Sequence, residues 1–305
     1  MPTDRPLIGI FLMLGFCIVA PLADSIAKLM SAFPLLVLLT VRFGIQAVVL
    51  FPLALGTRQK LWWTPRITRL VALRTGLHIV GIGLMFSALR YLPLADAVAI
   101  AFVMPFILLL LGRLVLAEEV GPRRIAACGV GFLGTLCVVQ PSFAEVGAPA
   151  LLPLGVAVVF ALFMLVTRQI ARQTDPVAMQ CTSGAMALVL LVPLLAVSDL
   201  SEMAAADQRD LLLFVALGLL GTVGHLLMTW SLRFAPASTL APMQYLEIPC
   251  AAVLGWLIFH EFPNALALFG IAITIASGLY IVWRESRISR ATAQPVPPAK
   301  PPVAG

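Results

Sequence analysis

Glu247 is the deepest ionisable side chain in an otherwise apolar stretch of this 305-residue chain. An ionisable group inside a bilayer costs several kcal/mol, so it is a functional candidate by default. Glu247 lies two residues before Pro249, and a proline lets a helix bend and expose a backbone carbonyl. A carboxylate beside such a break could bind a cationic group or accept a proton. The alternative is a structural Glu bonded to a neighbouring helix. Pro105 predicts a second break.

A second set of ionisable residues could close one end of the molecule with ion pairs. Asp24 and Lys28 are four residues apart, on one helix face, and can pair. Arg42 needs a partner, for which Asp24 or Asp96 is suitable. Asp96 also lies in the first turn of a predicted helix, where the helix dipole favours an acid. With Arg90, these residues predict an ion-pair gate; direct substrate binding is the less favoured alternative.

Several uncharged polar and aromatic residues are further candidates for binding or coupling. An isolated His within a membrane more often bonds to a neighbouring helix than relays protons, and both alternatives stay open here. Aromatic rings and thioethers suit a planar or sulfur-bearing solute, and ordinary packing explains them equally well. The candidates are His78, His225, Phe102, Met104, Trp230, Gln244 and Tyr245.

The sequence contains no recognisable motif for a cofactor, a metal or an enzyme active site. All five cysteines lie inside apolar runs, without a CxxC pair, and we expect free thiols. HExxH, GxSxG and nucleotide-binding glycine loops are absent. We therefore expect neither an enzyme nor an ATP-driven pump, and no bound cofactor or metal.

The composition predicts an integral membrane protein built from helices. Apolar residues make up 61% of the chain and charged residues 11%, which excludes a soluble domain and disorder. The net charge of +6 does not indicate nucleic-acid binding, because the basic residues are scattered. A span needs about 20 apolar residues. Ten ranges qualify: 7–30, 34–55, 69–90, 94–117, 122–140, 151–172, 176–197, 210–232, 238–260 and 264–284.

The distribution of Lys and Arg predicts the orientation of these spans. Fourteen of the 20 basic residues lie on the side that holds both termini, three lie on the other side and three lie within spans. Positive residues concentrate on the cytoplasmic side of a membrane. Both termini are therefore expected in the cytoplasm.

An internal repeat relates the two halves of the chain. At a shift of 143 residues, 15 of the 70 positions in 70–139 are identical, among them Gly81/Gly224 and the pair Glu118/Glu261. Five helices per repeat is an odd number, so the second copy must be inverted, an architecture of secondary transporters. We expect Glu118 and Glu261 each to cap a neighbouring helix N-terminus or to pair with a nearby Arg, such as Arg123 or Arg124 for Glu118. The glycines of 122–140 and 264–284 favour close packing within the chain, with a homodimer contact as the alternative.

The order of these motifs resembles the EamA type of the drug/metabolite transporter superfamily. The resemblance covers residues 7–285. It rests on Ala88–Ala97, Pro105 and Glu118 in the first half, and on Ser231–Ser238, Tyr245–Pro249 and Glu261 in the second. The runs from Asp24 to Lys28 and from Leu94 to Ala97 are most similar to members that move S-adenosylmethionine or riboflavin. The resemblance implies a proton-linked or exchange carrier with a central cavity, and it leaves the substrate open.

We therefore expect an all-α bundle of ten transmembrane helices, with repeats at 1–145 and 146–285 and a disordered cytoplasmic tail at 286–305. Its expected function is secondary transport of a small polar organic metabolite across the bacterial inner membrane by alternating access. An amino-acid or drug exporter is one alternative. A passive channel or membrane scaffold is another. The expected partners are the solute and the lipid bilayer.

Overall fold

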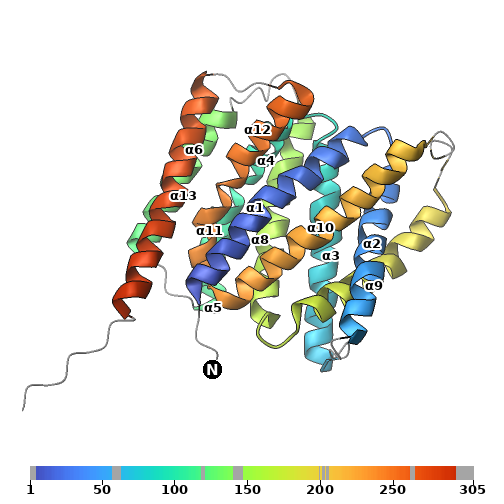
Figure 1. The fold of residues 1–305 in the computed structure, drawn as a ribbon, viewed down its shortest axis with the longest axis horizontal. Coiled ribbons are helices and arrows are strands. Elements are labelled where there is room, and N and C mark those ends of the chain that lie inside the picture. The colour runs from blue at the N-terminus through green and yellow to red at the C-terminus, as the bar shows by residue number, and fades with distance from the viewer. Residues whose placement is uncertain are drawn as a thin grey trace, which may run out of the picture.

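The computed structural model describes residues 5–56, 63–117, 121–139, 147–198, 200, 203, 206–261 and 265–292. Over these ranges the chain is helical, without a strand. The helices are α1 (Pro6–Leu29), α2 (Leu35–Gly56), α3 (Pro65–Ala88), α4 (Leu94–Ala101), α5 (Met104–Leu116), α6 (Pro122–Val139), the 3-10 turn η1 (Ala148–Leu151), α8 (Leu152–Ile170), α9 (Pro176–Ala196), α10 (Gln208–Phe234), α11 (Ala237–Gln244), α12 (Glu247–Phe259) and α13 (Ala265–Thr292) (Figure 1).

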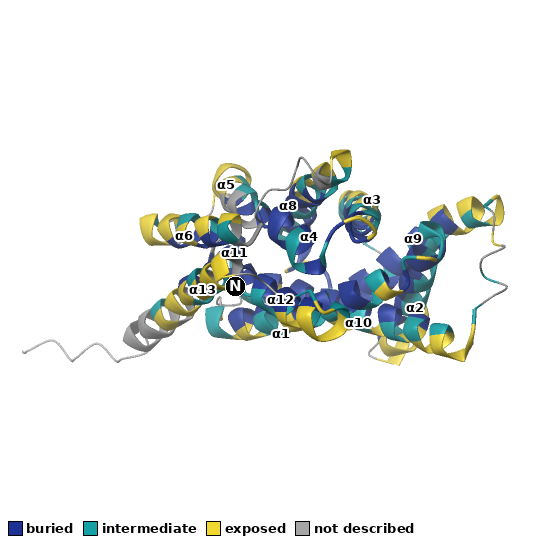
Figure 2. Cartoon of the chain, turned by 90° about the horizontal axis from the view of Figure 1, so that it is seen from above, coloured by how far each residue is buried: buried dark blue, intermediate teal, exposed yellow. Residues whose placement is uncertain are grey.

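Six helices of the described ranges, α1, α2, α3, α8, α9 and α10, are long and apolar enough to cross a membrane. The outer surface of the bundle is apolar as well, with Val189 74% and Val48 72% exposed. Figure 2 places the buried residues on the inward faces of the helices and the exposed ones on the outside. An apolar outer surface of this kind suits lipid and not water. The chain is a multi-pass membrane protein.

Two of the predicted spans are each divided into two helices. The range 94–117 contains α4 and α5, and the range 238–260 contains α11 and α12. Pro249 has no N–H to donate to the carbonyl of Tyr245, and the N–H of Ile248 donates to that carbonyl instead, at 3.3 Å. This tight i→i−3 bond ends one helix and begins the next. The breaks therefore fall just before Pro105 and Pro249, which lie in the first turns of α5 and α12.

The ends of the broken spans match at the repeat shift found in the sequence. Ala117, after α5, has φ 51°, and His260, after α12, has φ 58°; these are the described non-glycine residues with a left-handed backbone. The two positions are 143 residues apart. The same helix ending at the same place in both halves supports a structural repeat.

The two halves pack mainly against each other. α1 packs on α10, and the equivalent pair from the other half, α8 and α3, packs in the same way. α2 packs on α9 at one end of the bundle, and α6 packs on α13 at the other end (Figures 1 and 2). The glycine-bearing helices α6 and α13 thus contact each other within the chain. Exchanging each helix for its counterpart leaves these pairs unchanged, as expected for two repeats related by a pseudo-two-fold axis.

The last helix extends beyond the end of the predicted second repeat. α13 continues to Thr292, because the chain contains no proline or glycine between residues 279 and 292. Part of the tail expected at 286–305 is therefore helical, and residues 293–305 lie outside the described ranges. Glu118 also lies outside them.

Candidate functional site

An internal cavity of about 60 Å³ lies where helices of the two halves meet. α1, α2, α3, α8, α10, both segments of the first broken span and the start of α12 contribute to its wall. Six of the residues predicted from the sequence line this cavity: Asp24, Arg42, Phe102, Met104, His225 and Glu247.

Three charged side chains line this cavity without a direct hydrogen bond or ion pair in the described chain. Asp24 is 7% exposed, Arg42 3% and Glu247 7%. Among the described residues none of the three makes a hydrogen bond or an ion pair within 4 Å, and the Nε of Arg42 is buried without an acceptor. The guanidinium lies 5.8 Å from the ring centroid of Phe86, a weak cation–π contact. Buried charges are normally paired, so this arrangement is suited to a ligand that supplies the missing charges.

Each of these charges is positioned by a local feature of its helix. Glu247 is the first residue of α12, so the break before Pro249 brings its carboxylate to a helix N-terminus, where the dipole favours an anion. Arg42 fits because residue 221 is glycine: a Cβ there would lie 2.5 Å from Nη1 of Arg42. Asp24 lies one helical turn before the end of α1.

The remainder of the cavity wall is aromatic and sulfur-bearing. Besides Phe102 and Met104, it contains Phe16, Phe160, Met85, Met164 and Met228. Methionine is polarizable and flexible, and aromatic faces stack on planar groups. The wall can therefore hold a planar or apolar portion of a solute while the charged groups hold a polar portion.

The two predicted histidines meet between α3 and α10. The Nε2 atoms of His78 and His225 are 3.2 Å apart and their ring centroids are 4.1 Å apart. One Nε2 must donate and the other must accept, so the two neutral rings adopt opposite tautomers. Both Nδ1 atoms are buried without a partner in the described chain. Phe43 and Phe163 enclose the ring of His78, with centroids 4.9 and 4.8 Å away.

A hydrogen-bonded cluster around Arg74 lies one helical turn beyond the histidine pair. Arg74 is fully buried and donates to the hydroxyls of Thr167 at 2.9 Å, Ser183 at 3.1 Å and Thr229 at 3.4 Å. Gln180 donates to Thr229 at 3.1 Å and to the His225 carbonyl at 3.0 Å. Polar side chains of α3, α8, α9 and α10 are thereby tied together.

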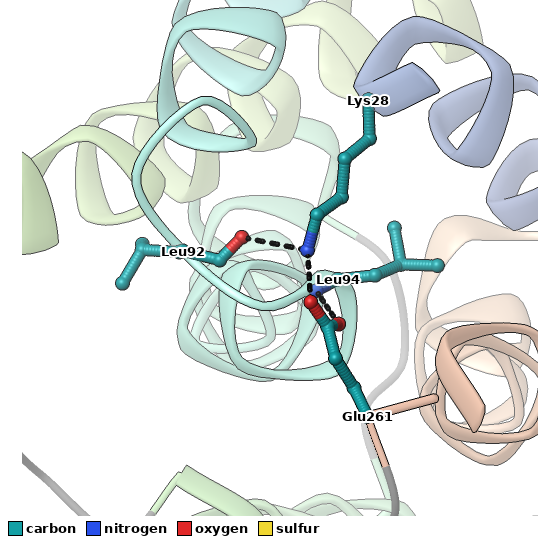
Figure 3. A network of polar contacts seen from close by, with 4 residues as sticks. All are labelled: Lys28, Leu92, Leu94 and Glu261. Carbon is teal, nitrogen blue, oxygen red and sulfur yellow. Dashed lines mark hydrogen bonds and ion pairs between the residues drawn. The ribbon is translucent and has the colours of Figure 1, made fainter. Parts of the chain in front are cut away.

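At the C-terminal end of α1, Lys28 pairs with Glu261 and not with Asp24 (Figure 3). The Nζ atom lies 2.5 Å from Oε1 of Glu261, and it also donates to the Leu92 carbonyl at 3.2 Å. Oε2 of Glu261 accepts from the Leu94 N–H at 3.1 Å and so caps α4. The expected structural role of Glu261 is therefore confirmed.

Two further members of the predicted gate lie at this end without an acid–base pair of their own. Arg90 donates to the Phe33 carbonyl at 2.7 Å and is exposed. Asp96 lies in the first turn of α4, as predicted, and forms no ion pair within 4 Å in the described chain.

The other candidates pack around the cavity without lining it. Trp230 packs with the cluster that contains Leu50, Cys181 and Leu226. Tyr245 is buried at the break between α11 and α12, with its ring 5.6 Å from that of Phe102 and its hydroxyl unpartnered in the described chain. The amide of Gln244 lies 2.9 Å from the sulfur of Met164.

Sequence reasoning missed the Arg74 cluster and most of the methionine wall. An arginine within a span was the available signal for the cluster, but its hydroxyl partners lie on three other helices, 93 to 155 residues away. The methionines of the cavity wall could not be recognised from the sequence, because a methionine occurs in the same apolar sequence pattern whether it faces a cavity or packs in the core.

The fold and the site together define a multi-pass helical membrane protein with a charged internal cavity between two repeated halves. Comparison with known proteins agrees with this class. The EamA-like transporter family model matches residues 7–140 and 148–283. The chain belongs to this family of membrane transporters.

Characterised relatives extend the likeness over most of the chain. A riboflavin transporter of Rhizobium johnstonii is 31% identical, over 72% of this chain and 72% of its own length. A riboflavin transporter of Vibrio cholerae is 28% identical, over 94% of this chain and 96% of its own length. An S-adenosylmethionine uptake transporter of Rickettsia bellii is 26% identical, over 81% of this chain and 83% of its own length. One solved crystal structure has the same fold, with a TM-score of 0.68 at 20% identity over 95% of this chain and 98% of its own.

Proposed function

We propose that the protein is a secondary transporter that moves a small polar organic metabolite across the bacterial inner membrane by alternating access. The main observation behind this proposal is that Asp24, Arg42 and Glu247 line the cavity and that none of them forms an ion pair within 4 Å in the described chain. A solute with both a cationic and an anionic group would satisfy both signs of charge. The relatives support the class, since they include transporters of riboflavin and of S-adenosylmethionine.

The cavity must widen before it can hold such a solute. Its volume of about 60 Å³ has room for a few water molecules, whereas pockets for drug-sized ligands have about 300 Å³ or more. The Lys28–Glu261 pair links helices beyond Asp24, and the Arg74 cluster links helices beyond the histidine pair. In this proposal the two sets of contacts are the closures of the bundle. We propose that these two closures open in turn. Ten spans in two inverted repeats, with both termini in the cytoplasm, are part of the same proposal.

The coupling group in this proposal is Glu247, with the histidine pair as the second candidate. Glu247 accepts a proton or the cationic group of the solute, and the two exclude each other. Transport is then either proton-linked or an exchange. His225 lines the cavity and contacts His78, so a change at the solute site reaches α3 through the pair.

The experiment is uptake into proteoliposomes, with and without a pH gradient or internal solute, for riboflavin, S-adenosylmethionine and a set of amino acids. We expect saturable flux that depends on the gradient or on counter-substrate. Glu247→Gln should abolish this saturable flux or its pH dependence, because glutamine has the shape of glutamate but carries no charge. Asp175→Asn is the matched control, since asparagine caps a helix as well as aspartate does.

Two outcomes would contradict the proposal. Linear, unsaturable flux indicates a channel. Unchanged transport and pH dependence in Glu247→Gln removes Glu247 from the mechanism. A thermal-shift measurement on the same preparations shows whether the variant is folded.

A further inference from the structure

Arg74 is a buried cation that has no acidic counter-ion among the residues that the structure describes. Its side chain has no exposed surface, and its three hydrogen-bond partners are neutral hydroxyls. The guanidinium also lies 4.5 Å from the ring centroid of Phe163. In the described chain it makes no ion pair with an acid. A charged side chain within a bilayer is costly and rare, so the presence of Arg74 without an acidic partner in the described chain requires an explanation.

The position of Arg74 follows from helix geometry. Arg74 precedes His78 by four residues on α3, and Thr229 follows His225 by four residues on α10. Since α3 and α10 run in opposite directions through the bundle, both steps lead one turn away from the cavity toward the same end. That end holds the start of α3 and the end of α10, opposite the Lys28–Glu261 pair. The Arg74 cluster is therefore the next polar layer after the cavity and the histidine pair.

The bonds of the cluster cross the boundary between the two halves. Arg74 belongs to the first half, whereas Thr167, Ser183 and Thr229 belong to α8, α9 and α10 of the second. Any rearrangement that separates the halves at this end breaks these bonds and leaves a guanidinium beside loose hydroxyls. A guanidinium with hydroxyl groups is a donor set for carboxylate or phosphate oxygens.

We infer that Arg74, with Ser183, Thr167 and Thr229, forms a second, inner site that binds a carboxylate or phosphate group of the solute when this end opens. The inference rests on the proposed alternating access. The cavity site holds the solute first through both signs of charge. The inner site then takes over its anionic group, while the hydroxyls hold Arg74 whenever this site is empty.

A substituted cysteine tests the site without knowledge of the solute. Ser183→Cys is introduced into a full-length protein whose five native cysteines are replaced, and the protein is reconstituted in liposomes. Two thiol reagents are added on the side of the termini: anionic methanethiosulfonate ethylsulfonate and its cationic ethyltrimethylammonium counterpart. Each rate is divided by the rate with free 2-mercaptoethanol. Because both reagents attack the same thiol, the ratio of rates reports the local charge and not the thiol's own reactivity.

We expect the anionic reagent to react about tenfold faster, since a unit charge within a few ångströms acts strongly at low dielectric. Arg74→Gln should abolish this preference and Arg74→Lys should retain it. The matched control, Arg209→Gln, removes an exposed cation at the start of α10, at the opposite end of the bundle, and should leave the preference intact.

Three results would overturn the inner site. The two reagents could react with Ser183→Cys at equal normalised rates, or the ratio of their rates could be unchanged when Arg74→Gln is added. The third result is that neither reagent reacts from this side of the membrane. Saturable flux is measured on the cysteine-free parent in the same liposomes. A preference for the anionic reagent without saturable flux would refute the proposed function and leave the inner site standing. Saturable flux without a preference for the anionic reagent would refute the inner site and leave the proposed function standing.

Discussion

At the scale of single residues, the site depends on the absence of a side chain at Gly221, because this leaves space for the guanidinium of Arg42. Arg42 occupies the space that a side chain at position 221 would fill, and its Nη1 atom lies 2.5 Å from where that Cβ would be. The guanidinium is the flexible end of a long side chain, so it moves more readily than the backbone of α10. Gly221 therefore sets the orientation of the cation in the cavity.

Gly221→Ala should raise the KM for transport several-fold with little change in Tm. The added methyl group displaces the guanidinium from its place on the cavity wall, while the helices keep their packing. Uptake kinetics and thermal unfolding of the same preparation measure the two effects. Gly76→Ala is the control, because no atom lies within 4 Å of a Cβ at that position. An unchanged KM would show that the position of Arg42 does not matter for transport.

Ionisable residues within apolar runs could be identified from the sequence because such residues are rare there. Asp24, Arg42 and Glu247 were found in this way, and the structure brings them to one cavity. The partner of Lys28 was not found, since a spacing of four residues favoured Asp24. The partner is 233 residues away, at a position that only the packing of the two halves determines.

At the scale of elements, Glu261 connects three parts of the structure. Its carboxylate follows α12, accepts from the first N–H of α4 and pairs with the end of α1. The same carboxylate caps α4 and pairs with Lys28, so a movement of α1 away from Glu261 also affects the group that caps α4. The side chains of Lys28 and Glu261 are 15% and 31% exposed, so water weakens the pair and its energy is modest.

Glu261→Gln should weaken this closure by about 1 kcal/mol, which corresponds to roughly fivefold. The amide oxygen can still accept from Leu94, but the charge opposite Lys28 is lost. A cysteine at position 104, on the cavity wall, should then react about fivefold faster with a reagent added on the Lys28 side. Asp210→Asn, an acid-to-amide change in the cap of α10, is the control. Equal rates would contradict a gating role for the pair.

Most helix boundaries were predictable to within two residues, but the start of α3, the end of α13 and the positions of the breaks were not. Pro105 and Pro249 indicated where the helices would be interrupted, and the interruptions fall two to four residues earlier because the unpaired carbonyl precedes the proline by a turn. A hydropathy pattern cannot show this, since the residues on both sides of each break are equally apolar. Glu247 at the start of a helix, and not in its middle, is a result of the structure.

At the scale of the whole molecule, the positions of Lys and Arg predict how the bundle is oriented in the membrane. The excess of Lys and Arg on the side of the termini predicts that residues 171–175 face the cytoplasm and residues 197–207 face the opposite side. Alkaline phosphatase fused after Ser198 should be active, and a fusion after Arg172 should be inactive. A green fluorescent protein at the C-terminus serves as the internal control and should fluoresce. The opposite pattern would invert the assignment of the two closures.

The repeat was visible in the sequence, but the way in which the halves assemble was not. A shift of 143 residues relates the positions of Gly81 and Gly224, yet it does not say which helices touch. In the structure most packing joins one half to the other. Neighbours in the sequence pack less closely than partners from opposite halves, and pattern analysis along the chain cannot detect that arrangement.

This assembly has a consequence for biosynthesis. Arg74 enters the membrane with α3, but the nearest of its three hydroxyl partners in the chain is 93 residues further on. At a synthesis rate of about 5–20 residues per second, that distance corresponds to roughly 5–19 s. During this interval a newly made first half carries a lone guanidinium in an apolar environment. The insertion machinery must therefore hold or shield α3 until the second half arrives.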